Sequence, residues 1–286
     1  MTGSASSQVR TVAVGGQPLR VAVRSGDPGR TPLLLLNGIG VGLEALDPVV
    51  EALDPTIPVI RFDPPGVGGS PLPATPYRLP GLARTVLRLL DVLGQEQVDV
   101  LGISWGGGLA QQLARTGGRR CRRLVLVATG SGALMVPAHP RVLARMATPR
   151  RYLDRNHLRR IAAEIYGGSA RTDPRIATWL LHTHGRVGPR RGYYYQLLAG
   201  AGWTSVPFLP ALRQPTLVLT GDDDPLIPTI NGRLLATLIP NARLHVYRGG
   251  HLELVADPGL LVPVIEEFLH ADPPAARHPT SEGEKQ

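Results

Sequence analysis

The sequence predicts an α/β fold in which a mostly parallel sheet of eight strands is flanked by helices. Three observations support this prediction. Two short apolar runs separated by Gly15-Gly16 open the chain as an antiparallel hairpin, strand and helix patterns then alternate up to residue 129, and the alternation resumes after residue 207. Because parallel strands are joined by right-handed crossovers, helices are expected on both faces of the sheet.

The expected strands are short runs rich in Val, Leu and Ile. They cover residues 11–14, 19–23, 33–36, 59–62, 98–103, 124–128, 216–220 and 243–247. The run at 33–36 is Leu at every position, which is typical of a strand buried on both faces. Between these strands the sequence predicts helices at residues 43–53, 82–93, 108–115, 231–238 and 259–270.

Between residues 130 and 207 the strand pattern disappears, and helical, arginine-rich and aromatic segments replace it. The helical segments expected there cover residues 141–146, 157–166 and 192–198. We therefore expect a helical cap, residues 130–207, inserted after the sixth strand of a core that comprises 10–129 and 208–270. The polar ends, residues 1–9 and 271–286, are expected to be flexible and disordered, respectively.

Composition excludes several classes of protein. The net charge is +9, and almost all of the positive charge is arginine, since Lys285 is the only lysine. No nucleic-acid-binding motif accompanies the arginine clusters at 115–123, 141–160 and 186–191, so we expect solvated faces and no nucleic acid. An anionic surface partner for these clusters is the alternative.

Cellular location and cofactors also follow from simple patterns. No apolar run approaches the ~20 residues that span a bilayer, and the polar N-terminus has no secretory pattern. A single cysteine, Cys121, excludes an internal disulfide, so a cytoplasmic protein is expected. The chain shows neither a cluster with metal-ligand spacing nor a nucleotide fingerprint, so we expect no metal and no cofactor.

The pentapeptide Gly102-Ile103-Ser104-Trp105-Gly106 fits Gly-x-Ser-x-Gly, the nucleophile elbow. In this turn a serine lies between a strand and a helix, in a strained backbone that crowds the positions two residues away. The expected strand at 98–103 and the expected helix at 108–115 provide this context. The sequence therefore predicts Ser104 as a nucleophile.

A serine nucleophile needs a base, and the base needs an orienting carboxylate. In the elbow architecture both follow the serine, in the order acid and then histidine. After the seventh strand, Gly-x-x-Asp-x-x-x-Pro fits Asp224 with Pro228, and Asp223 is the alternative acid. After the eighth strand His251 follows two glycines in a loop, so the predicted triad is Ser104, Asp224 and His251.

The oxyanion that forms during acyl transfer needs two fixed donors. We expect the backbone N–H of Trp105 and that of Ile39, in the loop Asn37-Gly38-Ile39-Gly40 after the third strand. The stretch 66–70, Gly-Val-Gly-Gly-Ser, invites a phosphate-loop reading. It lacks the full Gly-x-Gly-x-x-Gly spacing, and we interpret it as a structural turn beneath the site.

With these residues in place the chain resembles the α/β-hydrolases, and among them the intracellular depolymerases of medium-chain-length poly(3-hydroxyalkanoate). The matching stretches include the cap and are 37–40, 62–70, 104–107 with 110–112, 165–168, 202–205 and 221–228. The resemblance implies hydrolysis of ester bonds in a storage polyester through an acyl-serine, with release of 3-hydroxy acids, at the surface of cytoplasmic granules. It also implies that Ile39 and Trp105 line the acyl pocket, and that a serine in place of cysteine favours hydrolysis over polymerisation.

Fold and triad do not determine the substrate. A small-molecule carboxylesterase or lactonase and a cofactor-free haloperoxidase are alternatives in the same class, and a non-catalytic granule-binding or ligand-sensing protein is one from another class. Five aromatic residues of the cap are candidates for contact with the polymer or the granule, with core packing as the alternative role. They are Trp179, Tyr193, Tyr194, Tyr195 and Trp203.

Overall fold

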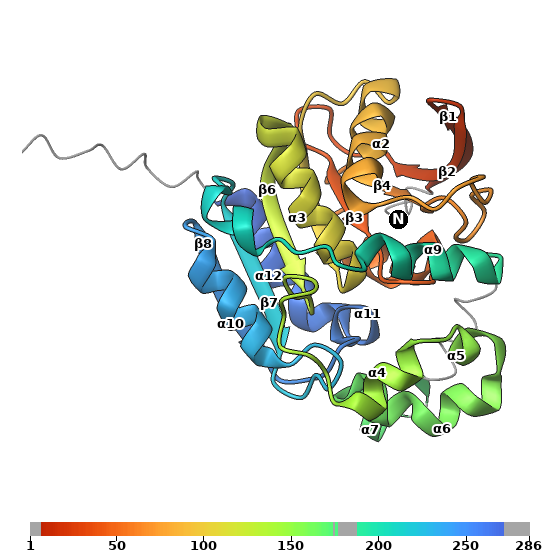
Figure 1. The fold of residues 1–286 in the computed structure, drawn as a ribbon. Coiled ribbons are helices and arrows are strands. Elements are labelled where there is room, and N and C mark those ends of the chain that lie inside the picture. The colour runs from red at the N-terminus through yellow and green to blue at the C-terminus, as the bar shows by residue number, and fades with distance from the viewer. Residues whose placement is uncertain (1–6, 174, 177–187, 272–286) are drawn as a thin grey trace, which may run out of the picture.

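The computed structural model describes residues 7–173, 175–176 and 188–271. At its centre lies one twisted sheet, which in this described part of the chain has eight strands in the order β1-β2-β4-β3-β5-β6-β7-β8 (Figure 1). β2 pairs antiparallel with both β1 and β4, and all the other neighbours are parallel. The predicted α/β class with a mostly parallel eight-stranded sheet is confirmed.

Every expected strand is present, with bounds that differ by at most three residues. The strands are β1 (Gln8–Val14), β2 (Gln17–Arg24), β3 (Leu33–Leu36), β4 (Val59–Phe62), β5 (Val98–Ile103), β6 (Cys121–Val127), β7 (Thr216–Gly221) and β8 (Ala242–Tyr247). β1 begins inside the segment 1–9 that we expected to be flexible. Its first residues pair with β2, Gln8 opposite Val23, which orders this part of the segment.

Side chains of the sheet alternate between two apolar layers. In β3, Leu34 and Leu36 enter the layer beneath α2 (Leu79–Val92), α3 (Trp105–Gly117) and α10 (Thr229–Leu238). Leu33 and Leu35 enter the opposite layer. That layer is covered by η1 (Leu43–Leu46), α1 (Asp47–Ala52), α11 (Glu253–Ala256) and α12 (Pro258–His270). Both faces of the sheet are therefore buried, as the all-leucine strand predicted.

The segment between β6 and β7 forms helices. They are α4 (Pro140–Met146), α5 (Arg150–Leu153), α6 (Arg155–Tyr166), α7 (Ser169–Thr172), α9 (Arg190–Gly200) and η4 (Val206–Ala211). Its two ends meet in a short antiparallel bridge between Gly132 and Thr204. In Figure 1 the helices α4 to α7 form a lobe of their own, whereas α9 lies against the sheet domain.

Helix α9 is held on the sheet domain at both of its ends. Near its start, a Cβ at Gly192 would lie 1.7 Å from the carbonyl oxygen of Gly66, so two glycines permit the backbones to touch. At its other end the Arg78 guanidinium donates to the carbonyl oxygens of Leu198 (2.8 Å) and Ala201 (3.1 Å). These contacts fix both ends of α9 on the sheet domain.

The expectation that the arginine clusters form solvated faces is wrong for Arg123 and Arg151, which are both buried. Arg123 donates to the carbonyl oxygens of Leu269 (3.0 Å) and Ala271, at the end of α12. Arg151 donates to the Tyr193 hydroxyl (2.9 Å) and lies over its ring. Guanidinium groups satisfy helix-terminal carbonyls and pack on aromatic faces, which explains their burial.

Cys121 is buried at the start of β6, and burial raises the pKa of its thiol, so a structural role fits it better than a reactive one. Within the residues that the structure describes, no helix has the length and apolar character needed to cross a bilayer.

The contact between α9 and the core gives a stability prediction. Gly192→Ala places a methyl group on the Gly66 carbonyl oxygen, so the helix must shift, and the free energy of unfolding should fall by about 1–3 kcal/mol. Urea unfolding followed by circular dichroism measures this change. Gly29→Ala is the matched control, because a Cβ there meets nothing within 4 Å, and it should stay within about 0.5 kcal/mol of the parent.

Candidate active site

Ser104 occupies the tight turn between β5 and α3. Its backbone has φ 53° and ψ −119°, in the left-handed region that L-residues rarely adopt. The turn brings neighbouring backbones so close that a Cβ at Gly102 would lie 2.4 Å from the Gly106 oxygen, and one at Gly106 would lie 2.2 Å from the Leu36 oxygen. The two glycines of the motif are therefore required by packing, and the strained serine is of the kind that functional sites retain.

Asp224 and His251 meet at the carboxyl ends of β7 and β8. His251 Nδ1 lies 2.8 Å from Asp224 Oδ2, and each residue is only 5% exposed. The other carboxylate oxygen, Oδ1, accepts from the N–H groups of Leu226 (2.9 Å) and Ile227 (2.8 Å). Because a carboxylate only accepts, Nδ1 carries the proton, and Nε2 of the neutral ring is left as a proton acceptor.

The three consecutive aspartates have different partners. Asp222 accepts from the Gly249 N–H (2.9 Å) and closes the turn between the β7 and β8 ends. Asp223 binds Arg171 of the cap through both carboxylate oxygens (2.7 and 3.0 Å) and accepts from Gly168 N–H (2.8 Å). Only Asp224 points at His251, so the geometry favours Asp224 over the alternative acid, Asp223.

The cap motif Tyr166-Gly167-Gly168 is wedged between the acid and histidine loops. The Tyr166 ring stacks on the His251 ring at 6.3 Å, and the Tyr166 carbonyl oxygen accepts from the His251 N–H (2.7 Å). A Cβ at Gly167 would lie 1.9 Å from the Asp223 oxygen, and one at Gly168 would lie 2.0 Å from the Gly250 nitrogen. These glycines leave room for both loops to close on the cap.

Glu253 is a buried carboxylate that sequence reasoning missed. Its Oε1 accepts from the N–H groups of Gly250 (2.9 Å) and Ser169 (2.7 Å), and its Oε2 accepts from the Ser169 hydroxyl (2.6 Å). It therefore ties the loop of His251 to the first turn of α7. The only sequence signal was an acidic residue two positions after the histidine, which has no motif of its own.

A cavity of about 70 Å³ opens beside Ser104 and His251. Apart from these two residues and Asn37, its lining is apolar or aromatic, from the loop of Ile39, from α11 and from the cap residues Met146 and Tyr166. Trp105 is not part of this lining in the described residues, contrary to our expectation. Its indole N–H instead donates to the Gln196 carbonyl oxygen on α9 (3.0 Å).

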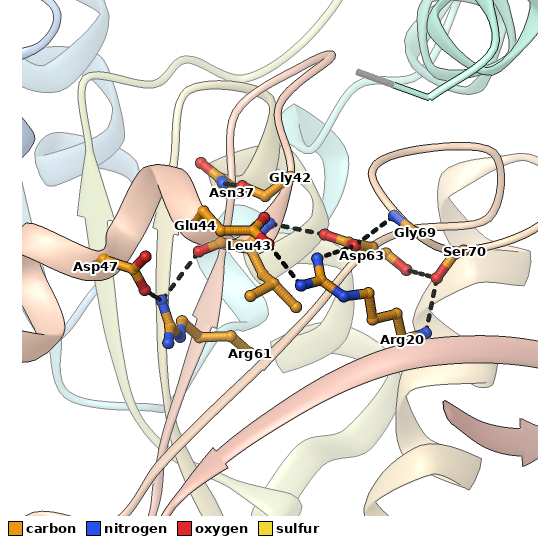
Figure 2. A network of polar contacts seen from close by, with 10 residues as sticks. All are labelled: Arg20, Asn37, Gly42, Leu43, Glu44, Asp47, Arg61, Asp63, Gly69 and Ser70. Carbon is orange, nitrogen blue, oxygen red and sulfur yellow. Dashed lines mark hydrogen bonds and ion pairs between the residues drawn. The ribbon is translucent and has the colours of Figure 1, made fainter. Parts of the chain in front are cut away.

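The loop after β3 is held by a buried polar network (Figure 2). Asn37 Nδ2 donates to the Gly42 oxygen (2.7 Å), and Asp63 Oδ1 accepts from the Leu43 N–H (2.7 Å). Asp63 Oδ2 accepts from the Gly69 N–H (2.7 Å) and from Arg20 (3.1 Å). The loop of Ile39 and the 66–70 turn thus share one carboxylate, which agrees with a structural role for that turn.

Asp63 is the centre of this network. It is fully buried, and burial raises the pKa of its carboxyl, while the Gly69 and Leu43 N–H groups and Arg20 act in the opposite direction. On the far side of the loop, Arg61 donates to the Leu43 oxygen (3.0 Å) and pairs with Asp47 (2.5 Å). None of these charged residues belongs to a sequence motif of the site, because each binds groups that lie apart from it in the sequence.

The cap aromatics divide between the two roles that the sequence left open. Tyr193 is buried against Arg151, Tyr194 is 43% exposed, and Tyr195 is partly buried. Trp203 is partly buried, and its indole N–H donates to Gln112 Oε1 (2.8 Å). Trp179 lies outside the described residues. Among the other four of these cap aromatics, which the structure describes, Tyr194 alone is exposed.

Comparison with known proteins agrees with the observed fold. A family model described as the alpha/beta hydrolase fold matches residues 31–256. The chain therefore belongs to the α/β hydrolase family. In the described part of the chain, no group of three His, Cys, Asp or Glu side chains is arranged to hold a metal.

Individual relatives are more specific. The chain is 54% identical over 264 residues, 92% of its length and 93% of the relative's, to a poly(3-hydroxyalkanoate) depolymerase of Ectopseudomonas oleovorans. It is 29% identical, over 87% of its length and 91% of the relative's, to a 2-hydroxy-6-oxononadienedioate/2-hydroxy-6-oxononatrienedioate hydrolase of Paraburkholderia phymatum. The crystal structure of a hydrolase from Pseudomonas aeruginosa superposes with a TM-score of 0.78 at 27% identity, over 95% of this chain and 100% of that one.

The Arg171–Asp223 pair gives a pH prediction. The Arg171 hydrogen bond lowers the pKa of Asp223 below 3.8, so the pair stabilises the fold above that pH and loses its effect as pH falls through the lowered pKa. Both side chains are nearly half exposed, so Asp223→Asn should cost only about 0.5 kcal/mol at pH 7. Urea unfolding of the parent and of Asp223→Asn at several pH values measures this difference in the free energy of unfolding. A difference that grew towards pH 3 would contradict the assignment.

Proposed function

We propose that this protein hydrolyses the ester bonds of poly(3-hydroxyalkanoate) of medium side-chain length and releases 3-hydroxy acids. The observation that carries the proposal is the 54% identity to a poly(3-hydroxyalkanoate) depolymerase, which extends over 92% of the chain and so includes the cap. Ser104 and His251 line an apolar cavity, and Asp224 lies 2.8 Å from His251 behind it, which supports ester hydrolysis by a serine nucleophile.

In the first step Nε2 of His251 takes the Ser104 proton while Oγ attacks the ester carbonyl carbon. The π electrons of the carbonyl move to its oxygen, which becomes an oxyanion. Asp224 stabilises the imidazolium through the Nδ1 contact and keeps the ring in the tautomer that can accept at Nε2. The backbone N–H groups of Ile39 and Trp105 are the proposed donors to the oxyanion.

Collapse of the tetrahedral intermediate re-forms the carbonyl and breaks the bond to the alkoxy oxygen. That oxygen, which is the 3-hydroxyl of the neighbouring repeat unit, receives the proton from His251. Water then attacks the acyl-Ser104 with His251 as the base, and the Ser104 oxygen leaves with the proton. The product is a free carboxylic acid, and no cofactor takes part in either half-reaction.

A second candidate function is the hydrolysis of small soluble esters or lactones. It is favoured by the size of the cavity, because about 70 Å³ is small beside the ~300–1,000 Å³ typical of ligand sites. For a polymer the same volume means that only part of one repeat unit lies inside and the rest of the chain lies outside. The two candidates therefore differ in what the outer surface of the cap must contact.

We place the protein in the cytoplasm, at the surface of storage granules. Large exposed apolar side chains on the cap support this location, since polyester granules offer an apolar surface. These side chains are Leu134, Val136, Leu143, Leu153, Tyr194 and Leu198, which are 41–64% exposed.

The triad assignment predicts a distinct pattern of losses. Ser104→Ala should abolish labelling by a fluorophosphonate probe, and Asp224→Asn should lower kcat on a p-nitrophenyl ester about 10⁴-fold because the ring loses its tautomer control. Asp223→Asn is the matched control and should stay within about threefold of the parent. Absence of labelling in the parent protein would refute the serine mechanism, and equal losses in both Asn variants would refute the choice of acid.

The substrate proposal is tested by turnover of an emulsified medium-chain polyester beside a short soluble ester. We expect release of 3-hydroxy acids, measured by gas chromatography of their methyl esters, and co-sedimentation of Ser104→Ala with the polymer. Activity on the soluble ester alone would reject the depolymerase function in favour of the second candidate. Ser104→Ala that stays in the supernatant would reject the granule-surface location.

A further inference from the structure

Gln196, on the cap helix α9, contacts both segments to which we assign the oxyanion donors. Its side-chain Oε1 accepts from the Gly40 N–H (2.7 Å), next to Ile39. Its backbone oxygen accepts from the Trp105 indole N–H (3.0 Å), beside the nucleophile. Gln196 is 0% exposed, so these contacts lie in a region that water does not reach.

The contact between Gln196 and Gly40 restrains a flexible, glycine-containing loop. Gly38 and Gly40 flank Ile39, and Gly40 has φ +79°, so the loop is built from residues with wide conformational freedom. Asn37, at the start of the loop, binds the Gly42 oxygen, and Asp63 binds the Leu43 N–H. This polar network therefore holds the loop where it begins and where it ends. The Gln196 bond instead fixes the peptide plane between Ile39 and Gly40, in the middle of the loop.

Stability alone does not explain a glutamine at this position. Its Nε2 is buried and has no hydrogen-bond partner among the described residues. Leaving a buried donor unpaired costs more than one ordinary hydrogen bond contributes net. An apolar side chain of the same size would remove this unpaired donor but would leave the buried Gly40 N–H without its acceptor, so stability gives no preference for glutamine and the distinguishing effect of the residue is the geometry that its bond to Gly40 imposes.

The way in which α9 is fixed to the sheet domain allows Gln196 to impose such a geometry. The Gly192–Gly66 contact and the Arg78 hydrogen bonds hold the helix at its two ends, and Gln196 lies between them. One residue of a fixed helix thus contacts the β3 loop through its side chain and α3 through its main chain. Because the β3 loop and the first residue of α3 both bind Gln196, this residue restrains the distance between them.

We propose that Gln196 is a positioning residue that sets the spacing of the Ile39 and Trp105 backbone donors, so that the cap helix α9 forms part of the oxyanion hole without touching substrate. The inference rests on the proposed function. Fixed donors stabilise the transition state without reorganisation, and misplacing a group by about 1 Å can cost about 100-fold in rate.

The test compares Gln196→Met with Gln112→Met on a soluble p-nitrophenyl ester. Gln112 is the matched control because it is also a buried glutamine that bonds an indole, and its side chain binds Trp203 and Thr116 rather than the oxyanion loop. Gln196→Met should lower kcat about 10- to 100-fold with KM within about threefold. Its inhibition constant for a trifluoromethyl ketone, which forms a tetrahedral adduct with serine, should rise by the same factor as kcat/KM falls.

Thermal melting of both variants separates this role from a structural one. Equal melting temperatures with a kcat loss confined to Gln196→Met would support positioning, whereas unchanged kcat and unchanged inhibitor affinity in that variant would overturn it. If Gln196→Met fails to fold, Gln196→Leu is measured against Gln112→Leu by the same criteria. An inactive parent protein would overturn the proposed function and this inference with it, while an active parent with an unaffected variant overturns this inference alone.

Discussion

The left-handed backbone of Ser104 is the constraint on which the rest of the site depends. A serine at φ 53° between β5 and α3 is possible only because Gly102 and Gly106 let three backbone segments come within contact. This turn places the hydroxyl above the carboxyl ends of the parallel strands, and it places the N–H of Trp105 at the start of α3. Every other group has to be brought to this point from a loop.

The cap and the sheet both hold the loops of Asp224 and His251 in place. Tyr166 stacks on His251 and binds its backbone, while Gly168 binds Asp223 beside the acid. Glu253 accepts from Ser169 of the cap and from Gly250, the residue before His251, and so joins the cap to the histidine loop. The Asp224–His251 distance of 2.8 Å is thus maintained by groups on the sheet and on the cap, which preorganises the pair before substrate arrives.

Sequence reasoning predicted the strands and proposed the elbow and the triad of Ser104, Asp224 and His251, because each leaves a local signal: an apolar period, a glycine spacing or a position after a strand. It did not reach Gln196, Glu253 or Asp63. These residues act on backbone N–H groups between 3 and 156 positions away, and a side chain that binds main chain leaves no pattern in the partner. The same reason explains Arg123 and Arg151, whose burial depends on carbonyl and aromatic partners far along the chain.

The division of contacts within the cap bears on how substrate choice and chemistry are linked. The α4 to α7 lobe contributes Met146 and Tyr166 to the cavity and also holds the acid and histidine loops. Helix α9 contributes nothing to that lining among the described residues, yet it binds the loop of Ile39 and the indole of Trp105. Changes at Met146, which lines the cavity and takes no part in the hydrogen bonds of the proposed triad, should therefore alter the preference for the acyl group of an ester with little loss of rate. Changes at Tyr166 should affect both properties, because this residue lines the cavity and its backbone oxygen binds the His251 N–H.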